Sequence, residues 1–196
     1  MNWYEKLNQY FPVEEMKSQE HMETLLKEKG EYYIKDEGPK HVLMYVEFEN
    51  FTFVDYLFVS KEARGEGLGK KLLNKLKEKN KAILLEVEPV NYEDTDTEKR
   101  LRFYAREGFQ HASRIGYNRR SLATGENNAM EILYWSPTNQ PEEEIYEAMK
   151  WTYENIHTFK DEKFYGESYD PTEEVLEFHS KDKEREDILD SIAVTK

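Results

Sequence analysis

The stretch Phe51-Thr52-Phe53-Val54-Asp55-Tyr56-Leu57-Phe58-Val59-Ser60 runs directly into Lys61-Glu62-Ala63-Arg64-Gly65-Glu66-Gly67-Leu68-Gly69-Lys70. The first ten residues are mostly aromatic or β-branched and include no glycine or proline, which predicts a buried strand. After the glycines, lysines fill one helical face and leucines the other, at Leu68, Leu72, Leu73 and Leu76, which predicts a helix. The glycine turn therefore opens into a helix whose first N–H groups are free, and such a turn binds anions, above all phosphates.

Two familiar phosphate-binding patterns do not fit this turn. A P-loop has four residues between its glycines and a Ser or Thr after its Lys. Here three residues separate Gly65 from Gly69, and Lys71 follows Lys70. The dinucleotide fingerprint G-x-G-x-x-G requires a third glycine where this chain has Lys70. The turn therefore belongs to another class of phosphate site.

Two further motifs follow the glycine turn in order. The first is Leu85-Glu86-Val87-Glu88-Pro89-Val90-Asn91, a strand with an Asn five residues after Glu86. The second is Arg102-Phe103-Tyr104-Ala105-Arg106-Glu107-Gly108-Phe109, a helix end of the form aromatic-Tyr-x-x-x-Gly-Phe. Together with Arg-x-x-Gly-x-Gly after a strand ending in Leu-x-Val, these motifs resemble the GNAT superfamily of N-acetyltransferases across residues 51–117.

The resemblance implies an α+β fold, an α/β/α sandwich-like arrangement with a mixed, mostly antiparallel sheet splayed between the family's fourth and fifth strands. We expect residues 1–137 to form the acetyltransferase domain and residues 138–196 an acidic helical C-terminal extension packed on or near it. Ser18 is expected to cap a helix within residues 1–29, and Thr97 the helix that carries Tyr104. The expected strands cover residues 32–35, 41–48, 51–60, 82–87, 109–122 and 129–136.

The resemblance also implies acetyl-CoA as co-substrate, with no metal. In the family a backbone N–H near the end of the fourth strand, here at Phe58 or Val59, hydrogen-bonds the thioester carbonyl. The spacing from Asn91 to Tyr104 is several residues longer than the family pattern, which puts the role of Asn91 in question. The expected cofactor-binding residues are Leu57, Phe58, Val59, Arg64, Gly65, Glu66, Gly67, Leu68, Gly69, Lys70 and Asn91.

Three side chains are the candidates for proton transfer. Tyr104 occupies the family position of the general acid that protonates the departing thiolate. Glu86 matches the glutamate that acts as base in the subgroup acetylating N-terminal amines, and Asp55 on the adjacent strand is the other carboxylate that can reach the cleft. The alternative for these buried carboxylates is a salt bridge to an arginine: Arg100, Arg102 or Arg114.

Composition narrows the class of protein. The net charge of the 196 residues is −13, and residues 138–196 contribute −10 of it, which argues against a nucleic-acid binder. The chain has no cysteine, no apolar run long enough to span a membrane, and no signal-peptide pattern at its start. We therefore expect a cytoplasmic protein that binds neither nucleic acid nor membrane.

The acceptor stays open at the level of sequence. Acidic groups near the cleft favour a cationic amine, whereas Arg114, Arg119 and Arg120 would equally receive an anionic substrate. The first hypothesis is transfer of an acetyl group from acetyl-CoA to a primary amine, of a small molecule or a protein, by direct attack in a ternary complex. The alternatives are a catalytically silent acetyl-CoA-binding module that binds a partner through its acidic tail, and a glycine turn that binds only a nucleotide. For the acidic tail three uses stay open, as a cover over the acceptor site, a homodimer surface or a surface for a basic partner protein, and a purely solvated helical face is the alternative.

Overall fold

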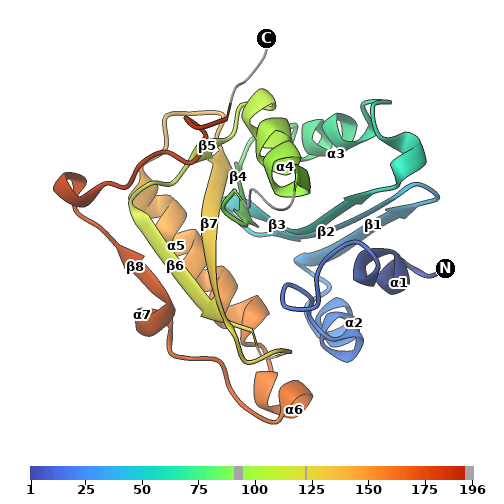
Figure 1. Cartoon of the computed structure of the whole chain (residues 1–196). Helices are drawn as coiled ribbons and strands as arrows, with labels where there is room; N and C mark the ends of the chain where they lie inside the picture. The colour runs from blue at the N-terminus through green and yellow to red at the C-terminus, as the bar shows by residue number, and fades with distance from the viewer. Residues whose placement is uncertain (91–94, 122, 193–196) are drawn as a thin grey trace.

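The strands form one sheet in the order β1-β2-β3-β4-β7-β6-β8, with β5 paired to β7 (Figure 1). The computed structural model describes residues 1–90, 95–121 and 123–192. Within this part, β3 and β4 run parallel and the other pairs run antiparallel, which confirms the predicted mixed sheet. The strands are β1 (Tyr33–Gly38), β2 (His41–Glu47), β3 (Phe51–Val59), β4 (Ala82–Val87), β5 (Gln110–His111), β6 (Ile115–Arg120), β7 (Asn127–Trp135) and β8 (Leu176–Phe178).

Helices cover both faces of the sheet, as the expected sandwich requires (Figure 1). One hydrophobic cluster joins α1, α2 and α5 to one face through Leu7, Met22 and Met149. The other joins α3 and α4 to the opposite face through Leu73 and Leu101. The helices are α1 (Trp3–Asn8), α2 (Gln19–Glu28), α3 (Leu68–Lys77), α4 (Thr95–Arg106), α5 (Glu142–Thr152), α6 (Asp161–Tyr165) and α7 (Thr172–Val175). No helix in the described ranges has the length and apolar character needed to cross a membrane.

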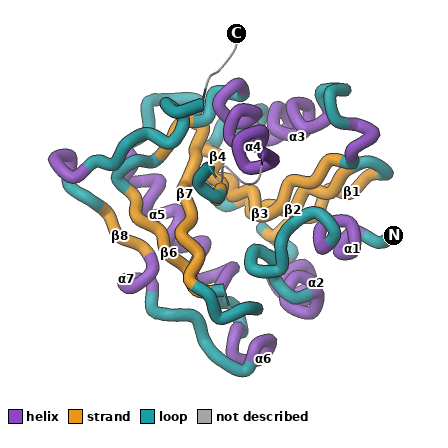
Figure 2. The backbone as a smooth tube through the Cα atoms, viewed as in Figure 1, coloured by secondary structure: helices purple, strands orange, loops and turns teal. Residues whose placement is uncertain are grey.

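Capping residues explain where some of these helices begin. The Ser18 side chain accepts a hydrogen bond from the His21 N–H and caps α2, as predicted. The loop 9–18 separates α2 from α1 and lies beside β3 (Figure 2). The predicted cap at Thr97 is wrong, because α4 already begins at Thr95 and Thr97 lies inside its first turn.

The predicted strand over residues 109–122 is two strands, β5 and β6. A turn closed by the Ile115 N–H and the Ala112 carbonyl separates them. The break allows β5 to pair with the C-terminal half of β7 and β6 with its N-terminal half. A tertiary requirement, that both segments reach one long partner strand, thus overrides a continuous β-forming sequence.

The segment from residue 138 onward contributes to the same core. Pro141 is the N-cap of α5, and acidic residues fill the helix's first turn, where its dipole favours them. Ile145 and Met149 are fully buried against the sheet. Further on, β8 extends the sheet by pairing with β6. The division of the chain at residue 137 stays a prediction.

Candidate functional site

A β-bulge in β3 opens the sheet at its centre. Val54 lies opposite Tyr45 and Tyr56 lies opposite Met44, so that Asp55 is an extra residue in the strand. Pairing of β3 with β4 ends at Val54 and Leu85, and the rest of β3 departs from its parallel neighbour. This is the splay that the resemblance predicts. It borders a cavity of about 690 Å³.

The glycine turn lines one end of this cavity, which we call the glycine end. Gly65 and Gly67 have φ angles of +85° and +77°, and a Cβ at either position would meet no atom within 4 Å. The first helical hydrogen bond runs from the Lys71 N–H to the Gly67 carbonyl at 3.0 Å. The amides of the residues between them, Leu68, Gly69 and Lys70, therefore have no acceptor inside α3. The turn presents positive backbone groups in open space, the arrangement that suits a diphosphate.

Tyr104 of α4 also lines the cavity. It packs against Phe103 and Phe109 with ring-centroid distances of 5.2 and 5.4 Å. Burial raises the pKa of its hydroxyl, and the charge of Arg100 opposes this only in part. The hydroxyl therefore keeps its proton through neutral pH and can donate it inside the cavity.

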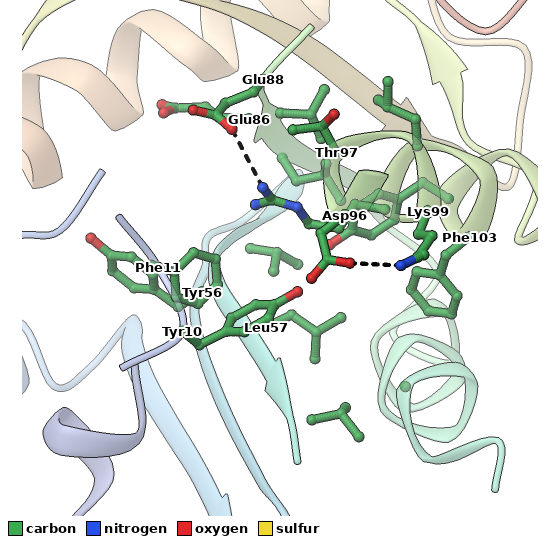
Figure 3. A pocket seen from close by; sticks show the side chains of 18 of the residues that line it. Tyr10, Phe11, Tyr56, Leu57, Glu86, Glu88, Asp96, Thr97, Lys99 and Phe103 are labelled. Carbon is green, nitrogen blue, oxygen red and sulfur yellow. Dashed lines mark hydrogen bonds and ion pairs between the residues drawn. The ribbon is translucent and has the colours of Figure 1, made fainter. Parts of the chain in front are cut away.

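The loop 9–18 also lines the cavity, and we call the part around Glu15 and Lys17 the loop end. The Tyr56 hydroxyl donates to the Glu15 carbonyl and accepts from the Lys17 N–H, both at 2.9 Å. These two bonds fix the loop on β3 and bring the side chains of Glu15 and Lys17 to the cavity wall. Figure 3 shows Glu86 of β4 and Glu88, the first residue after it, across from the rings of Tyr10, Phe11 and Tyr56.

Asp55 is held by two donors at the loop end. Lys17 Nζ lies 2.6 Å from its Oδ1, and the Tyr33 hydroxyl donates to its Oδ2 at 2.7 Å. Burial lowers the pKa of Lys17, and the charge of Asp55 opposes that effect. The pair therefore satisfies both buried charges, and the salt bridge expected as an alternative is to a lysine that sequence inspection did not single out.

Glu86 is also fully engaged. Its Oε1 accepts hydrogen bonds from His157 Nε2 at 2.6 Å and from the Tyr117 hydroxyl at 2.9 Å, and its Oε2 lies 3.7 Å from Arg119. Burial lowers the pKa of His157, and the charge of Glu86 opposes this effect. Burial would raise the pKa of Glu86, but His157 and Arg119 together outweigh it and hold it below its ordinary value. Glu86 is thus a weak base in this setting.

The pKa of Glu15 is shifted in the direction opposite to that of Glu86. Its side chain is 10% exposed, its Oε2 lies 3.9 Å from Arg100, and its buried Oε1 has no hydrogen-bond partner among the described residues. Burial raises the pKa of Glu15 to about 8; the nearby Glu88 adds to this, and Arg100 opposes it. Glu88 is itself 3.4 Å from Arg100 (Figure 3). A carboxyl group that titrates near neutral pH inside a cleft is suited to proton transfer.

Most of the residues expected from sequence line this cavity. The group comprises Asp55, Leu57, Val59, Arg64, Gly65, Gly67, Leu68, Gly69, Lys70, Glu86 and Tyr104. Phe58 points to the other face of β3 and packs against Tyr10 with a centroid distance of 5.6 Å. Glu66 instead pairs with Lys40 at 3.2 Å. Asn91 lies outside the described residues.

Sequence inspection missed Glu15, Lys17 and His157 as members of the site. The signal for the first two was available: Glu15 and Lys17 flank Met16 between two helical segments, in a loop with Tyr10 and Phe11. Nothing in the sequence links His157 to Glu86, 71 positions away. Within the described residues, no group of three or more His, Asp or Glu side chains is placed to hold a metal ion.

Comparisons with known proteins agree with this geometry. A family model described as "Acetyltransferase (GNAT) domain" matches residues 28–111, and a curated relative with 67% identity over 193 residues has an acetyltransferase description. The chain therefore belongs to the GNAT family, and with it to the acyl-CoA N-acyltransferases.

That relative is "Putative acetyltransferase YjbC" of Bacillus subtilis (strain 168), and the match covers 98% of this chain and 100% of the relative. Among solved structures, the chain is similar to "Putative acetyltransferase from GNAT family from Bacteroides thetaiotaomicron". That match has a TM-score of 0.61 and 26% identity, and it covers 78% of this chain and 88% of the other.

Proposed function

We propose that the protein transfers the acetyl group of acetyl-CoA to a primary amine by direct attack in a ternary complex. One observation carries this proposal: a single cavity connects the free amides of the glycine turn to the titratable carboxyl of Glu15. A donor held at the glycine end and an amine held at the loop end would meet beside Tyr104. Such positioning by itself supplies much of a rate enhancement.

The glycine end fits the donor. The amides of Leu68, Gly69 and Lys70 would hold the diphosphate, and the open space beside Gly65 and Gly67 leaves room for it. Arg64, which lies 5.2 Å above the Tyr10 ring, would add positive charge. The edge of β3 beyond Val54 has no partner in β4 and offers backbone groups to the pantetheine arm. The Ser60 N–H donates to the Lys40 carbonyl of the β2 side, so the Phe58 N–H faces β2 as well, and the N–H of Val59 would be the donor to the thioester carbonyl.

The side chains of Tyr104 and Glu15 would transfer the two protons that the reaction moves. Attack of the amine nitrogen on the carbonyl carbon forms the C–N bond and breaks the C–S bond; the amine loses one proton and the sulfur gains one. Tyr104 would donate to the sulfur, because its hydroxyl is protonated at neutral pH. Glu15 would accept the proton of the amine, since its Oε1 is free of described partners and its pKa lies near neutrality.

The two carboxylates expected from sequence would then position other groups. Asp55 holds Lys17, and through it the loop 9–18, while Glu86 holds Arg119. Both already bind buried cations or hydrogen-bond donors, so a proton transferred to either would break a buried pair. Their bonding therefore favours a structural contribution over that of base.

Two measurements test the proposed function. Calorimetry should show that acetyl-CoA binds, and a thiol-release assay over a panel of amines should show turnover. Absence of acetyl-CoA binding would refute the proposal, whereas tight binding without turnover of any amine would favour the silent module.

Two expectations for residues 138–196 stay predictions: that they form a separate acidic extension, and that this extension binds a second copy or a partner protein. The cytoplasmic location also stays a prediction. Several acidic residues of this segment have partners within the chain: Glu143 pairs with Arg114 at 3.0 Å, and Glu167 with Arg120 at 3.0 Å. These contacts leave less free charge for a homodimer or protein partner than composition alone suggests.

A further inference from the structure

Arg119 is the arginine of β6 whose side chain reaches the cavity. Its side chain is only 6% exposed, yet it lines the loop end. The two other arginines considered from sequence are used elsewhere. Arg114 donates to Glu143 and to the His179 carbonyl. Arg120 donates to Glu167 and to the Ser168 carbonyl.

The guanidinium of Arg119 lacks hydrogen bonds to the described residues. The nearest carboxylate oxygen is Glu86 Oε2 at 3.7 Å, beyond hydrogen-bond reach, and the other oxygen of Glu86 is taken by His157 and Tyr117. A guanidinium has five N–H donors in a planar fork that matches a carboxylate or phosphate. Within the described residues, Glu86 therefore orients Arg119 and leaves its donors available to a group inside the cavity.

The charges of the loop end balance. Lys17 pairs with Asp55, Arg119 with Glu86, and Arg100 with Glu88. Glu15 is left over, and because burial raises its pKa to about 8 it is largely uncharged at neutral pH. A polycationic amine would find no surplus negative charge here, whereas a molecule with one positive and one negative group adds no net charge to the balanced site.

We propose that the acceptor is a small amine that also carries a carboxylate or a similar anionic group, as an amino acid does. Its anionic group would bind the guanidinium of Arg119, and its amine would face Glu15 and Glu88. This inference rests on the proposed acetyl transfer and narrows the substrate class. The rings of Phe11 and Tyr56 and the side chain of Met130, which line the same end, would contact the apolar part of the molecule.

Matched sets of amines test the inference with the full-length protein. Each set holds an amino acid, its carboxamide and its decarboxylated amine, and α-, β- and γ-amino acids with aliphatic and aromatic side chains are included. The acid of at least one set should exceed its carboxamide and its decarboxylated amine about 10-fold or more in kcat/KM. If neutral or cationic members are equal or better in every set, the inference is wrong.

Variants at two adjacent arginines assign the effect. Arg119→Met should raise KM for the acid about 10-fold or more and leave the carboxamide nearly unchanged, and Arg119→Lys should fall between. Arg120→Met, a neighbour outside the cavity, should keep the preference. A loss that is equal for acid and carboxamide would show a structural role for Arg119 and would overturn the inference.

Calorimetry separates this inference from the proposed function. If acetyl-CoA does not bind, the proposed function fails. If acetyl-CoA binds but the amino acids neither bind to that complex nor react, the proposed function stands and the anionic acceptor is excluded. Thermal unfolding of each variant verifies that Arg119→Met remains folded, and binding of the acid to Arg119→Lys gives a second readout should it not.

Discussion

The glycine end of the cavity comes from one contiguous segment, residues 57–70, whereas the loop end takes its side chains from the loop 9–18, β3, β4, α4 and β6. At the glycine end the binding groups are mainly backbone amides, oriented by the strand–turn–helix path itself. At the loop end they are charged side chains, each held by a partner from a different element. Asp55 with Lys17 and Glu86 with Arg119 are the clearest pairs.

This difference has an energetic consequence. Backbone amides at a helix start are oriented at no extra cost, so the glycine end is sensitive mainly to added bulk. Buried charges must be paired, and removing one partner of such a pair typically costs about 3–5 kcal/mol. The loop end should therefore respond to removal of single charges, and substitutions at the two ends should produce different kinetic effects.

The largest expected effect comes from filling the glycine end. Gly67→Val should weaken coenzyme A binding by about 100-fold or more, because the side chain would occupy open space beside the amides and strain a φ of +77°. Calorimetric titration measures it. Gly125→Val is the matched control, since Gly125 has a φ of +75° and equally open surroundings but lies outside the cavity. An equal loss of coenzyme A affinity in both variants would show that backbone strain is responsible, and not the filled space beside the amides of the glycine turn.

Tyr104→Phe should come next and act on turnover. We expect kcat to fall roughly 10- to 1,000-fold with little change in coenzyme A affinity, because only the donated proton is lost. Steady-state kinetics with calorimetry measures both. Tyr134→Phe serves as control, because Tyr134 is as buried as Tyr104, at 8% exposure, but its hydroxyl donates to Gln110. Unchanged turnover in Tyr104→Phe would remove Tyr104 from the mechanism.

Glu15→Gln sharpens the comparison at the loop end. In the unsubstituted protein, kcat/KM should rise with pH through about 8, because a base acts only when deprotonated. The variant should lose this limb of the pH profile and be slower by roughly 10- to 100-fold, with unchanged coenzyme A affinity. Glu14→Gln, one residue away and outside the cavity, should keep the full profile. A profile that persists in Glu15→Gln would assign the proton to another group.

The smallest effect is on stability. An unfolded Glu ionises near pH 4.3. The folded chain therefore holds an extra proton on Glu15 up to about pH 8, and stability falls as pH rises through that range. Below about pH 6.5 the buried His21 and His157, whose pKa values burial lowers, act in the opposite direction, because unfolded histidines take up protons there.

In the window from pH 6.5 to 8 the proton on Glu15 is the larger contribution, and the last protons of the unfolded His21 and His157 offset part of it. The free energy of unfolding should decrease by about 1 kcal/mol across it, measured by urea denaturation at both pH values. Glu15→Gln should remove this decrease, while Glu14→Gln should keep it. An equally steep decrease in Glu15→Gln would show that burial of this carboxyl does not set the pH response.

Much of the fold and of the glycine end could be predicted from the sequence. The glycine turn, the strand before it and Tyr104 are encoded by short contiguous motifs, and the structure places Tyr104 and most residues of the turn on one cavity. The loop end could not be predicted in the same way. Asp55 and Glu86 were identified as buried carboxylates that need an explanation. Their partners are far away in the sequence: Lys17 is 38 positions from Asp55, and His157 is 71 positions from Glu86.

The sequence by itself determined the strand–turn–helix segment and the family it resembles, because backbone geometry there follows from local residue type: β-branched and aromatic residues, then glycines, then spaced leucines. Only the tertiary structure decided that the pKa of Glu15 is raised and that of Glu86 lowered. An extra residue at Asp55 opens the sheet, and the loop 9–18 then buries Glu15 beside Glu88 while Arg119 and His157 surround Glu86. A pKa depends on burial and neighbouring charges in three dimensions, so identical side chains in one sequence acquire opposite properties.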